Sequence, residues 1–203
     1  YNVKHLLYAS SSSVYGMNDK IPFSEDDRTD SPVSLYAATK KANELMAYAY
    51  SNLYKFSTTG LRFFTVYGPW GRPDMAPYIF MKSILKEEPI HIFNNGNMRR
   101  DFTYITDIIR GVVDIVKDEP KDVRAEIYNI GHGEPIELID FIKCMEDVVG
   151  VKGKYIFEGM KLGDVTCTYA DVSKLEKDFG YSPKVGIREG LEEMYLWLKV
   201  NMK

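Results

Sequence analysis

The chain has 203 residues, 45% hydrophobic and 27% charged, a composition typical of a soluble globular protein with a sizeable core. Its formal net charge is -3 and its Lys and Arg are scattered, so no nucleic-acid partner is expected. No apolar run is long enough to span a bilayer, and the two cysteines lack metal-ligand spacing and are compatible with a reducing cytoplasm.

The first predicted element is an apolar strand over residues 3–9, which runs into the serine run Ser10–Ser13. A short apolar run of this kind is typical of a buried parallel strand. Ligands of open α/β sheets bind at the carboxyl ends of the strands, so the serines are expected at a ligand site. A polar loop over residues 16–30 follows and is expected to cross the mouth of that site.

A long helix is predicted next, with Ser31 as N-cap, Pro32 as first helical residue and an end near Tyr54. Residues four apart share a helix face, so Tyr36 and Lys40 point the same way. A cation held close lowers the pKa of a tyrosine from its ordinary value of about 10. Tyr36 is therefore a candidate general base near neutral pH, although the pentapeptide alone also fits a surface tyrosine above a solvated lysine.

The later apolar residues of this helix recur at helical spacing and are expected to pack on a sheet; they are Leu45, Met46, Ala49 and Leu53. A break over residues 68–73 is expected to lead into a second lobe. The remaining predicted strands cover residues 58–66, 90–93, 100–105, 126–130 and 154–158, with a turn over 94–97. The remaining predicted helices cover residues 77–85, 136–149, 171–179 and 187–200, together with a helix capped by Thr106 that carries residues 108–116.

The serine run, the Tyr36-x-x-x-Lys40 pair and the segment Leu61–Pro69 together resemble the extended short-chain dehydrogenase/reductases, and among them the nucleotide-sugar epimerases. The resemblance covers essentially the whole chain. It implies an α/β fold, with the carboxyl-terminal part of a Rossmann-type doubly wound parallel sheet in residues 1–70 and 101–143. A smaller α/β lobe for the nucleotide sugar is expected in residues 71–100 and 144–203.

The family binds NAD through a glycine-rich turn, and neither Gly-x-Gly-x-x-Gly nor Gly-x-x-Gly-x-x-Gly occurs here. The chain is therefore expected to be the carboxyl-terminal portion of a longer enzyme and to be inactive by itself. An alternative is a catalytically inactive module that binds nucleotide sugars. The full-length enzyme is expected to be a cytoplasmic homodimer with no membrane association.

The resemblance implies NAD-dependent epimerisation at C4 of a UDP-hexose through a transient 4-keto sugar, with UDP-glucuronate as the preferred substrate. UDP-glucose, UDP-N-acetylglucosamine and a related dehydratase or decarboxylase reaction are the alternatives. The implied catalytic residues are Ser11, Tyr36 and Lys40, and the implied cofactor contacts are Ala9, Ser10, Tyr36, Lys40 and Phe64. Related dehydratases and decarboxylases carry a carboxylate near the serines, where this chain has Ser12 and Ser13. A hydroxyl cannot do the acid–base work of a carboxylate near neutral pH, which favours simple epimerisation.

The substrate contacts that the resemblance implies are Ser12, Ser13, Thr65, Arg72, His91, Ile92, Phe93, Arg100 and Asp164. Arg72 lies in a segment that resembles the glucuronate 4-epimerases, and its planar fork suits a carboxylate; the alternative is a turn residue paired on the surface. Arg100 matches the family arginine that grips the UDP diphosphate, the alternative being to cap carbonyls or pair with Asp101. Lys161 stands where galactose enzymes have a second arginine, so a second diphosphate contact is left open.

Overall fold

A computed structural model describes residues 3–118, 120–161 and 163–201 of the chain. Its strands are β1 (His5–Ser11), β2 (Ser57–Phe63), β3 (Thr65–Tyr67), β4 (Pro89–Ile92), β5 (Arg99–Arg100), β6 (Phe102–Tyr104), β7 (Ala125–Ile130), β8 (Ile136–Glu137) and β9 (Lys154–Phe157). Its α-helices are α1 (Leu35–Tyr54), α2 (Ala76–Leu85), α3 (Ile105–Lys117), α4 (Leu138–Val149), α5 (Ser173–Phe179) and α6 (Ile187–Asn201). Two 3-10 turns, η1 (Ser12–Tyr15) and η2 (Phe93–Gly96), complete the described elements.

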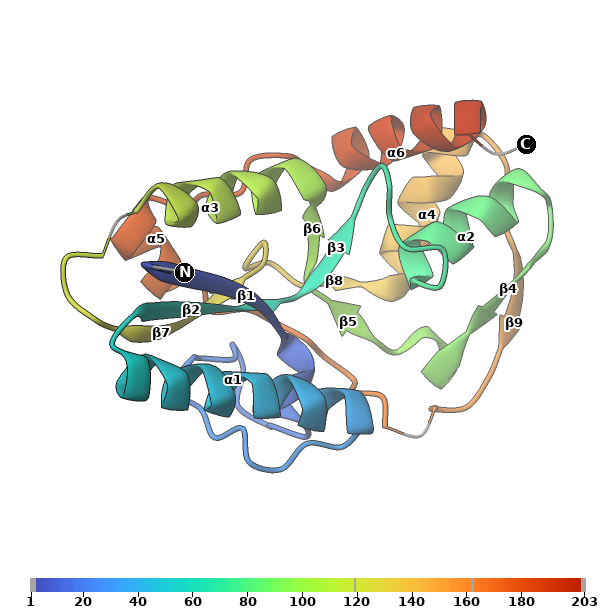
Figure 1. Cartoon of the computed structure of the whole chain (residues 1–203). Helices are drawn as coiled ribbons and strands as arrows, with labels where there is room; N and C mark the ends of the chain where they lie inside the picture. The colour runs from blue at the N-terminus through green and yellow to red at the C-terminus, as the bar shows by residue number, and fades with distance from the viewer. Residues whose placement is uncertain (1–2, 119, 162, 202–203) are drawn as a thin grey trace.

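The first half of the molecule is a parallel sheet in the order β1-β2-β7. Figure 1 shows α1 beneath this sheet and α3 with α5 above it. Helices on both faces leave no face of β2 to solvent, so even its polar residues Thr58 and Thr59 are buried. The predicted α/β fold with a doubly covered parallel sheet is confirmed.

The second half has its own core, built where α2, α4 and α6 meet the short strands that lead away from the sheet. Phe102 of β6 stacks on Phe141 of α4 with ring centroids 3.8 Å apart. Strands β4 and β9 pair in parallel along the outer edge of this half, as Figure 1 shows. The pairs β3–β6 and β5–β8 lie between the two halves.

The division into two lobes is a proposal, and the packing of α4 and α5 differs from the boundaries expected from the sequence. Leu175 of α5 and Tyr181 are buried with β2, β7 and α3, although the expected second lobe included them. Leu138 and Phe141 of α4 are buried with α2 and α6, although residues up to 143 were expected in the first lobe. Helix α5 packs against the half opposite to the one expected, and the expected boundary at residue 143 falls inside α4, which packs as a whole with the second half.

Helix α1 begins three residues later than predicted. Its N-cap is Ser34, whose hydroxyl accepts a hydrogen bond from the amide of Ala37 at 3.1 Å; Ser31 and Pro32 precede the helix. The predicted end at Tyr54 is confirmed, and Lys55 closes the helix in the left-handed conformation at φ 56°.

The prediction that the later apolar residues of α1 pack on the sheet is wrong. Leu45, Met46 and Leu53 are 60%, 54% and 71% exposed, and Ala49 is exposed too. The buried face of α1 carries Ala37, Glu44, Ala47 and Ser51 instead. The apolar spacing therefore indicated a helix correctly but not the side that faces the sheet.

Other boundaries differ by a few residues. The predicted strand 58–66 is two strands, because Phe64 leaves β2 before β3 turns toward β6. The cap of α3 is Tyr104 rather than Thr106, and residues 136–137 pair with β5 before α4 begins.

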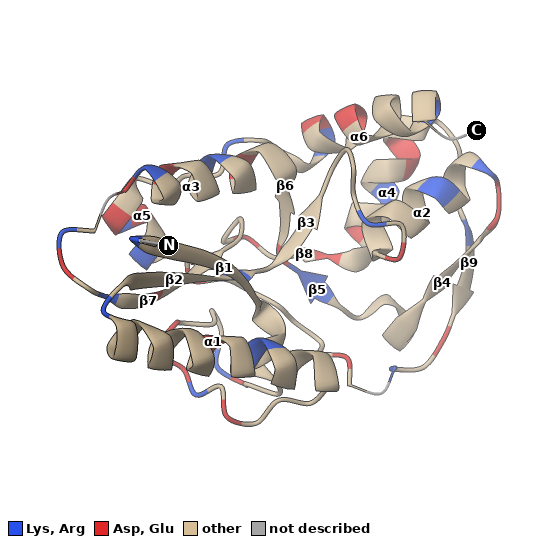
Figure 2. Cartoon of the chain, viewed as in Figure 1, with Lys and Arg blue, Asp and Glu red and all other residues tan. Residues whose placement is uncertain are grey.

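Charged side chains are spread over both halves, and Figure 2 shows acidic and basic segments interspersed without a continuous basic face. Helix α1 is mostly uncharged in this view. Within residues 3–118, 120–161 and 163–201, no helix combines the length and the apolar character needed to cross a bilayer.

Candidate active site

An open cleft of about 640 Å³ lies at the carboxyl ends of β1 and β2, where the first turns of α1 pass over the sheet. Its lining includes ten of the residues singled out from the sequence: Ala9, Ser10, Ser11, Ser12, Ser13, Tyr36, Lys40, Phe64, Thr65 and Arg72. Parallel strands bring their carboxyl ends to one edge of a sheet, which is why residues far apart in sequence meet here.

Tyr36 and Lys40 lie one helical turn apart on the side of α1 that faces the cleft. The Nζ atom of Lys40 donates to the carbonyl oxygen of Ala9 at 3.1 Å and lies 5.7 Å from the centre of the Tyr36 ring. Tyr36 itself is 50% exposed. The structure thus brings a cation beside the tyrosine ring and leaves the ring open to the cleft.

The serine run divides its hydroxyl groups between the cleft and the protein interior. Ser11 caps η1, accepting from the amide of Ser13 at 3.2 Å and donating to the Ser13 hydroxyl at 3.1 Å. Ser10 donates to the buried carboxylate of Glu44 at 2.6 Å. Neighbouring residues of a strand point to opposite faces, so Ser11 offers its hydroxyl to the cleft, whereas Ser10 offers mainly its backbone.

A second, smaller cavity of about 210 Å³ adjoins the cleft and shares Ser12, Ser13 and Thr65 with it. Arg100 and Asp164 line its far side. Residues of the loop expected to cross the site, Gly16 and Phe23, also line this cavity. A ligand could therefore extend from Tyr36 past the shared residues to Arg100.

Arg100 is largely buried and donates hydrogen bonds to several acceptors. It donates to Asp164 at 2.8 Å and to the carbonyl oxygens of Arg99 and Thr166 at 2.9 and 3.2 Å. Burial lowers the pKa of Arg100, against the raising effect of Asp164. Carbonyl capping, one alternative from the sequence, is observed, while the ion pair goes to Asp164 and not to Asp101.

Asp101 has a structural role next to Arg100. Its fully buried carboxylate accepts from the amides of His132, Gly133 and Ala170 at 2.7, 3.0 and 3.1 Å. These bonds tie the end of β5 to the turn after β7 and to the segment that follows Asp164. Asp101 therefore fixes the backbone from which Arg100 reaches the smaller cavity.

Arg72 lines the cleft from an exposed loop. Its guanidinium is bidentate on Asp74, at 3.1 and 2.6 Å. Both side chains are about two-thirds exposed, so such a pair contributes little to stability and can open at low cost.

His91, Ile92 and Phe93 line neither of these two cavities. His91 pairs with Glu158, Ile92 is completely buried in the second core, and Lys161 lies 5.2 Å from the Phe93 ring centre. Contact of these three residues with a substrate stays a prediction.

A buried polar network beneath the cleft was not predicted from the sequence. Arg62 of β2 holds both carboxylate oxygens of Glu44, at 2.9 and 3.0 Å, and also donates to Tyr15 at 3.0 Å. Tyr15 donates in turn to Asn129 of β7 at 2.6 Å. The signal in the sequence was a charged residue inside the apolar strand Leu61–Phe63.

The described part of the chain contains no group of three His, Cys, Asp or Glu side chains arranged to hold a metal ion. Cys144 and Cys167 are free thiols.

The two cavities lie at the edge of a parallel α/β sheet where the strands end. Residues 1–131 match the NAD dependent epimerase/dehydratase family, and the chain belongs to that family.

Curated relatives carry both uncharacterised and functional names. The chain is 52% identical over 99% of its length to the uncharacterised protein MJ1055 of Methanocaldococcus jannaschii, of which it covers 61%. It is 45% identical over 95% of its length to UDP-glucuronate 4-epimerase 2 of Arabidopsis thaliana, of which it covers 48%. The chain thus spans 48–61% of the length of these two relatives.

Solved structures share the fold of this chain. UDP-glucuronic acid 4-epimerase from Bacillus cereus, in complex with UDP-glucuronic acid and NAD, superposes with a TM-score of 0.92 at 36% identity. The match covers 98% of this chain and 63% of that enzyme.

Proposed function

We propose that the full-length protein is an NAD-dependent 4-epimerase of a UDP-hexose, with UDP-glucuronate as the substrate. The observation that carries this proposal is the union of two cavities. One holds Ser11, Tyr36 and Lys40, the other holds Arg100, and Ser12, Ser13 and Thr65 belong to both. A sugar at the first and a diphosphate at the second would suit a nucleotide sugar.

The cleft residues fit the nicotinamide end of NAD, which on binding would accept a hydride from C4 of the sugar and return it. Lys40 supplies a cation at the rim, Phe64 an apolar wall and Ala9 a strand end. Lys40 and Tyr36 would meet the ribose hydroxyls, with Ala9, Ser10 and Phe64 beside the nicotinamide.

Tyr36 is the proposed base for the C4 hydroxyl, because its half-exposed side chain lines the cleft and the Lys40 ammonium lies near its ring. The Lys40 ammonium stabilises negative charge on the phenol oxygen, and Ser11 holds the reacting oxygen by a hydrogen bond. Tyr36 later returns the proton, so the residue is unchanged after each turnover.

The uronate carboxylate is assigned to Ser12, Ser13, Thr65 and Arg72. A 4-keto uronic acid is a β-keto acid that tends to lose CO₂, so an epimerase must hold its carboxylate away from the geometry of decarboxylation. Hydroxyl donors suit that task, and the absence of Asp and Glu from the described lining of the large cleft argues against the dehydratase and decarboxylase alternatives. The names of the relatives at 43–45% identity support the same substrate.

Arg100 is the proposed diphosphate contact, with Asp164 as its partner and a neighbour of the nucleotide ribose. Strand β4 with His91, Ile92 and Phe93 is the proposed wall for the uracil. A homodimeric assembly and a cytoplasmic location are further proposals for the full-length enzyme.

The deciding experiment incubates the full-length protein and NAD with UDP-glucuronate, UDP-glucose or UDP-N-acetylglucosamine and follows products by NMR. Conversion of UDP-glucuronate to UDP-galacturonate in preference to the other two supports the proposal. Turnover of another UDP-sugar alone corrects the substrate. Binding of UDP-sugars without any turnover would favour a binding module instead.

A further inference from the structure

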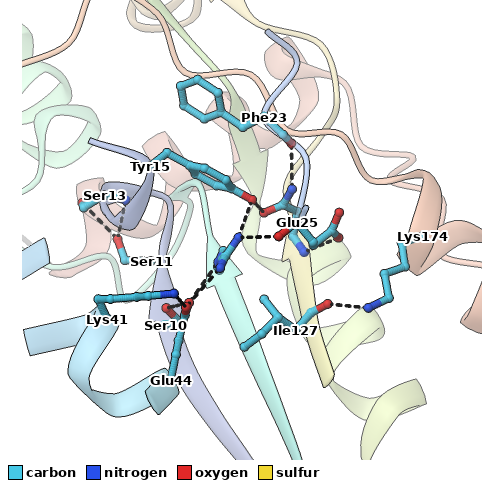
Figure 3. Close-up of polar contacts among 12 residues, drawn as sticks. Ser10, Ser11, Ser13, Tyr15, Phe23, Glu25, Lys41, Glu44, Ile127 and Lys174 are labelled. Carbon is cyan, nitrogen blue, oxygen red and sulfur yellow. Dashed lines mark hydrogen bonds and ion pairs between the residues drawn. The ribbon is translucent and has the colours of Figure 1, made fainter. Parts of the chain in front are cut away.

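Beneath the cleft, the ion pair of Glu44 and Arg62 joins the helix that carries Tyr36 and Lys40 to the centre of the sheet. The two residues are 5% and 3% exposed. Glu44 lies one turn after Lys40 and two turns after Tyr36 on α1, whereas Arg62 lies near the end of β2. Figure 3 shows Glu44 with Ser10 and Lys41 gathered around it.

Each oxygen of the Glu44 carboxylate has two donors. Oε1 accepts from Arg62 Nε at 2.9 Å and from the Ser10 hydroxyl at 2.6 Å. Oε2 accepts from Arg62 Nη2 at 3.0 Å and from Lys41 Nζ at 3.3 Å. Burial would raise the pKa of Glu44, but the hydrogen bonds and charge of Arg62 bring that pKa below its usual value. The carboxylate is therefore fixed in position as well as in charge.

Residues on two successive turns of α1 thus form hydrogen bonds with two successive residues of β1. Glu44 holds the side chain of Ser10, and Lys40 holds the carbonyl oxygen of Ala9. Ser11 follows directly and carries the hydroxyl assigned to the reacting oxygen. A shift of α1 along its axis would break both hydrogen bonds and change the position of Tyr36 relative to Ser11.

Stability alone does not account for a pair of this kind. Replacing a buried ion pair by apolar residues of similar volume is often neutral or stabilising, because removing two charges from water is costly. The pair instead fixes the orientation of the two side chains, because the guanidinium donates two parallel hydrogen bonds to a carboxylate in one planar arrangement. Arg62 is itself held from the far side by Tyr15 and by the carbonyl oxygen of Glu25, at 3.0 and 3.3 Å.

We propose that Glu44 and Arg62 are positioning residues of the reaction: their bidentate pair sets the register of α1 against β1 and so aligns Tyr36 and Lys40 with Ser11. This inference rests on the proposed function. Neither residue lines the large cleft, so both act through Ser10, Lys40 and the helix.

The test compares Arg62→Lys and Glu44→Gln in the full-length enzyme, with kcat and KM for the UDP-sugar, calorimetric binding of that sugar and thermal melting. Arg62→Lys retains the charge but loses the fork, and Glu44→Gln retains the shape but loses the charge. We expect kcat to fall about tenfold or more in both, while KM and sugar affinity stay within about twofold.

Two matched controls separate positioning from general loss of stability. Glu146 is a carboxylate of similar burial, 4% exposed, held by Gly153 and Tyr155 in the other half of the molecule. Glu146→Gln should lower the melting temperature but leave kcat unchanged. Lys41→Met removes the most distant donor to Glu44, at 3.3 Å and 24% exposed, and should leave kcat within about twofold because both bonds from Arg62 remain.

A kcat within twofold of the parent in folded Arg62→Lys and Glu44→Gln would overturn the inference, and so would an equal fall in Glu146→Gln. Failure of both variants to fold would make the pair a stability element and overturn it too. If the parent enzyme itself turns over no UDP-sugar, the proposed function fails instead, which the same assay shows before any variant is made.

Discussion

Tyr36 and Lys40 lie side by side in the cleft but are held differently. The lysine is tied to the end of β1 by the carbonyl oxygen of Ala9, whereas the tyrosine is half-exposed to the cleft. One side chain is therefore fixed by the fold while the other can meet a substrate. This arrangement suits the proposed role of Tyr36 as general base at a sugar hydroxyl.

Replacing Tyr36 by Phe in the full-length enzyme should reduce kcat by roughly 10²–10⁴-fold, the usual contribution of a positioned general base. UDP-sugar affinity should persist, because the change removes one hydroxyl and little shape. The measurement is steady-state kinetics with calorimetric binding. Tyr48→Phe, on the exposed side of the same helix, is the control and should keep parental kcat. Near-normal turnover in Tyr36→Phe would rule out Tyr36 as the base.

Arg72 is predicted to select a uronate. A hydrogen bond to a charged group contributes about 1.5–3 kcal/mol, and 1.4 kcal/mol is about tenfold in affinity. Arg72→Ala should therefore weaken the binding of UDP-glucuronate about tenfold or more and leave the affinity for UDP-glucose nearly unchanged, as measured by calorimetry. Asp74→Ala removes the partner of the Arg72 guanidinium and should not weaken the binding of UDP-glucuronate. Equal losses for both sugars in Arg72→Ala would assign the arginine to the diphosphate.

At the scale of one element, α1 combines an ordinary helix start with an unusual buried face. Ser34 caps the helix, and Tyr36 follows within the first turn. The interior side carries small residues and one carboxylate, while large apolar residues lie outside. Small residues let the helix approach the sheet closely enough for Glu44 to reach Arg62.

Removing the cap in Ser34→Ala should lower the free energy of unfolding by about 1 kcal/mol, because the amide of Ala37 loses its acceptor. Urea denaturation measures this change. Ser182→Ala, at an exposed position between α5 and α6, should stay within about 0.5 kcal/mol of the parent. A cap variant as stable as the control would show that the first turn, with Tyr36, is held by tertiary contacts alone.

Across the whole molecule, the two halves are joined by buried polar and aromatic contacts above β3 and β6. Asp107 of α3 is fully buried and accepts from the amides of Lys184 and Val185, both at 2.9 Å. Gly190 of α6 lies so close to β3 that a Cβ atom there would approach the Tyr67 hydroxyl to 2.4 Å. These contacts hold the segment that leads into α6 against the sheet half.

Asp107→Ala should reduce the free energy of unfolding by about 1–3 kcal/mol, since two amides lose their acceptor in a partly buried place. Asp114→Ala, two turns later on α3 and half-buried, should have a much smaller effect. Chemical denaturation followed by circular dichroism distinguishes the two variants. Equal losses of stability would mean that the Asp107 bonds do not join the halves.

The sequence by itself determined the kinds of element and the local chemistry. Helical periodicity is a local property of the backbone, so Tyr36 and Lys40 could be assigned to one face before any fold was known. A strand that ends in serines likewise predicted a polar site at a sheet edge, and Ser11 lies there. The α/β class was implied by the family resemblance that these segments carry.

Only the tertiary structure decided which face of each element is buried and which distant residues meet. Leu45, Met46 and Leu53 satisfy a helical pattern but are exposed, because burial depends on what packs against the helix and not on its own spacing. The pairing of Glu44 with Arg62 arises from sheet order and helix register, neither of which is local in sequence. The same long-range geometry brings residues 65, 100 and 164 around one cavity, so its extent could not be predicted from the motifs that line it.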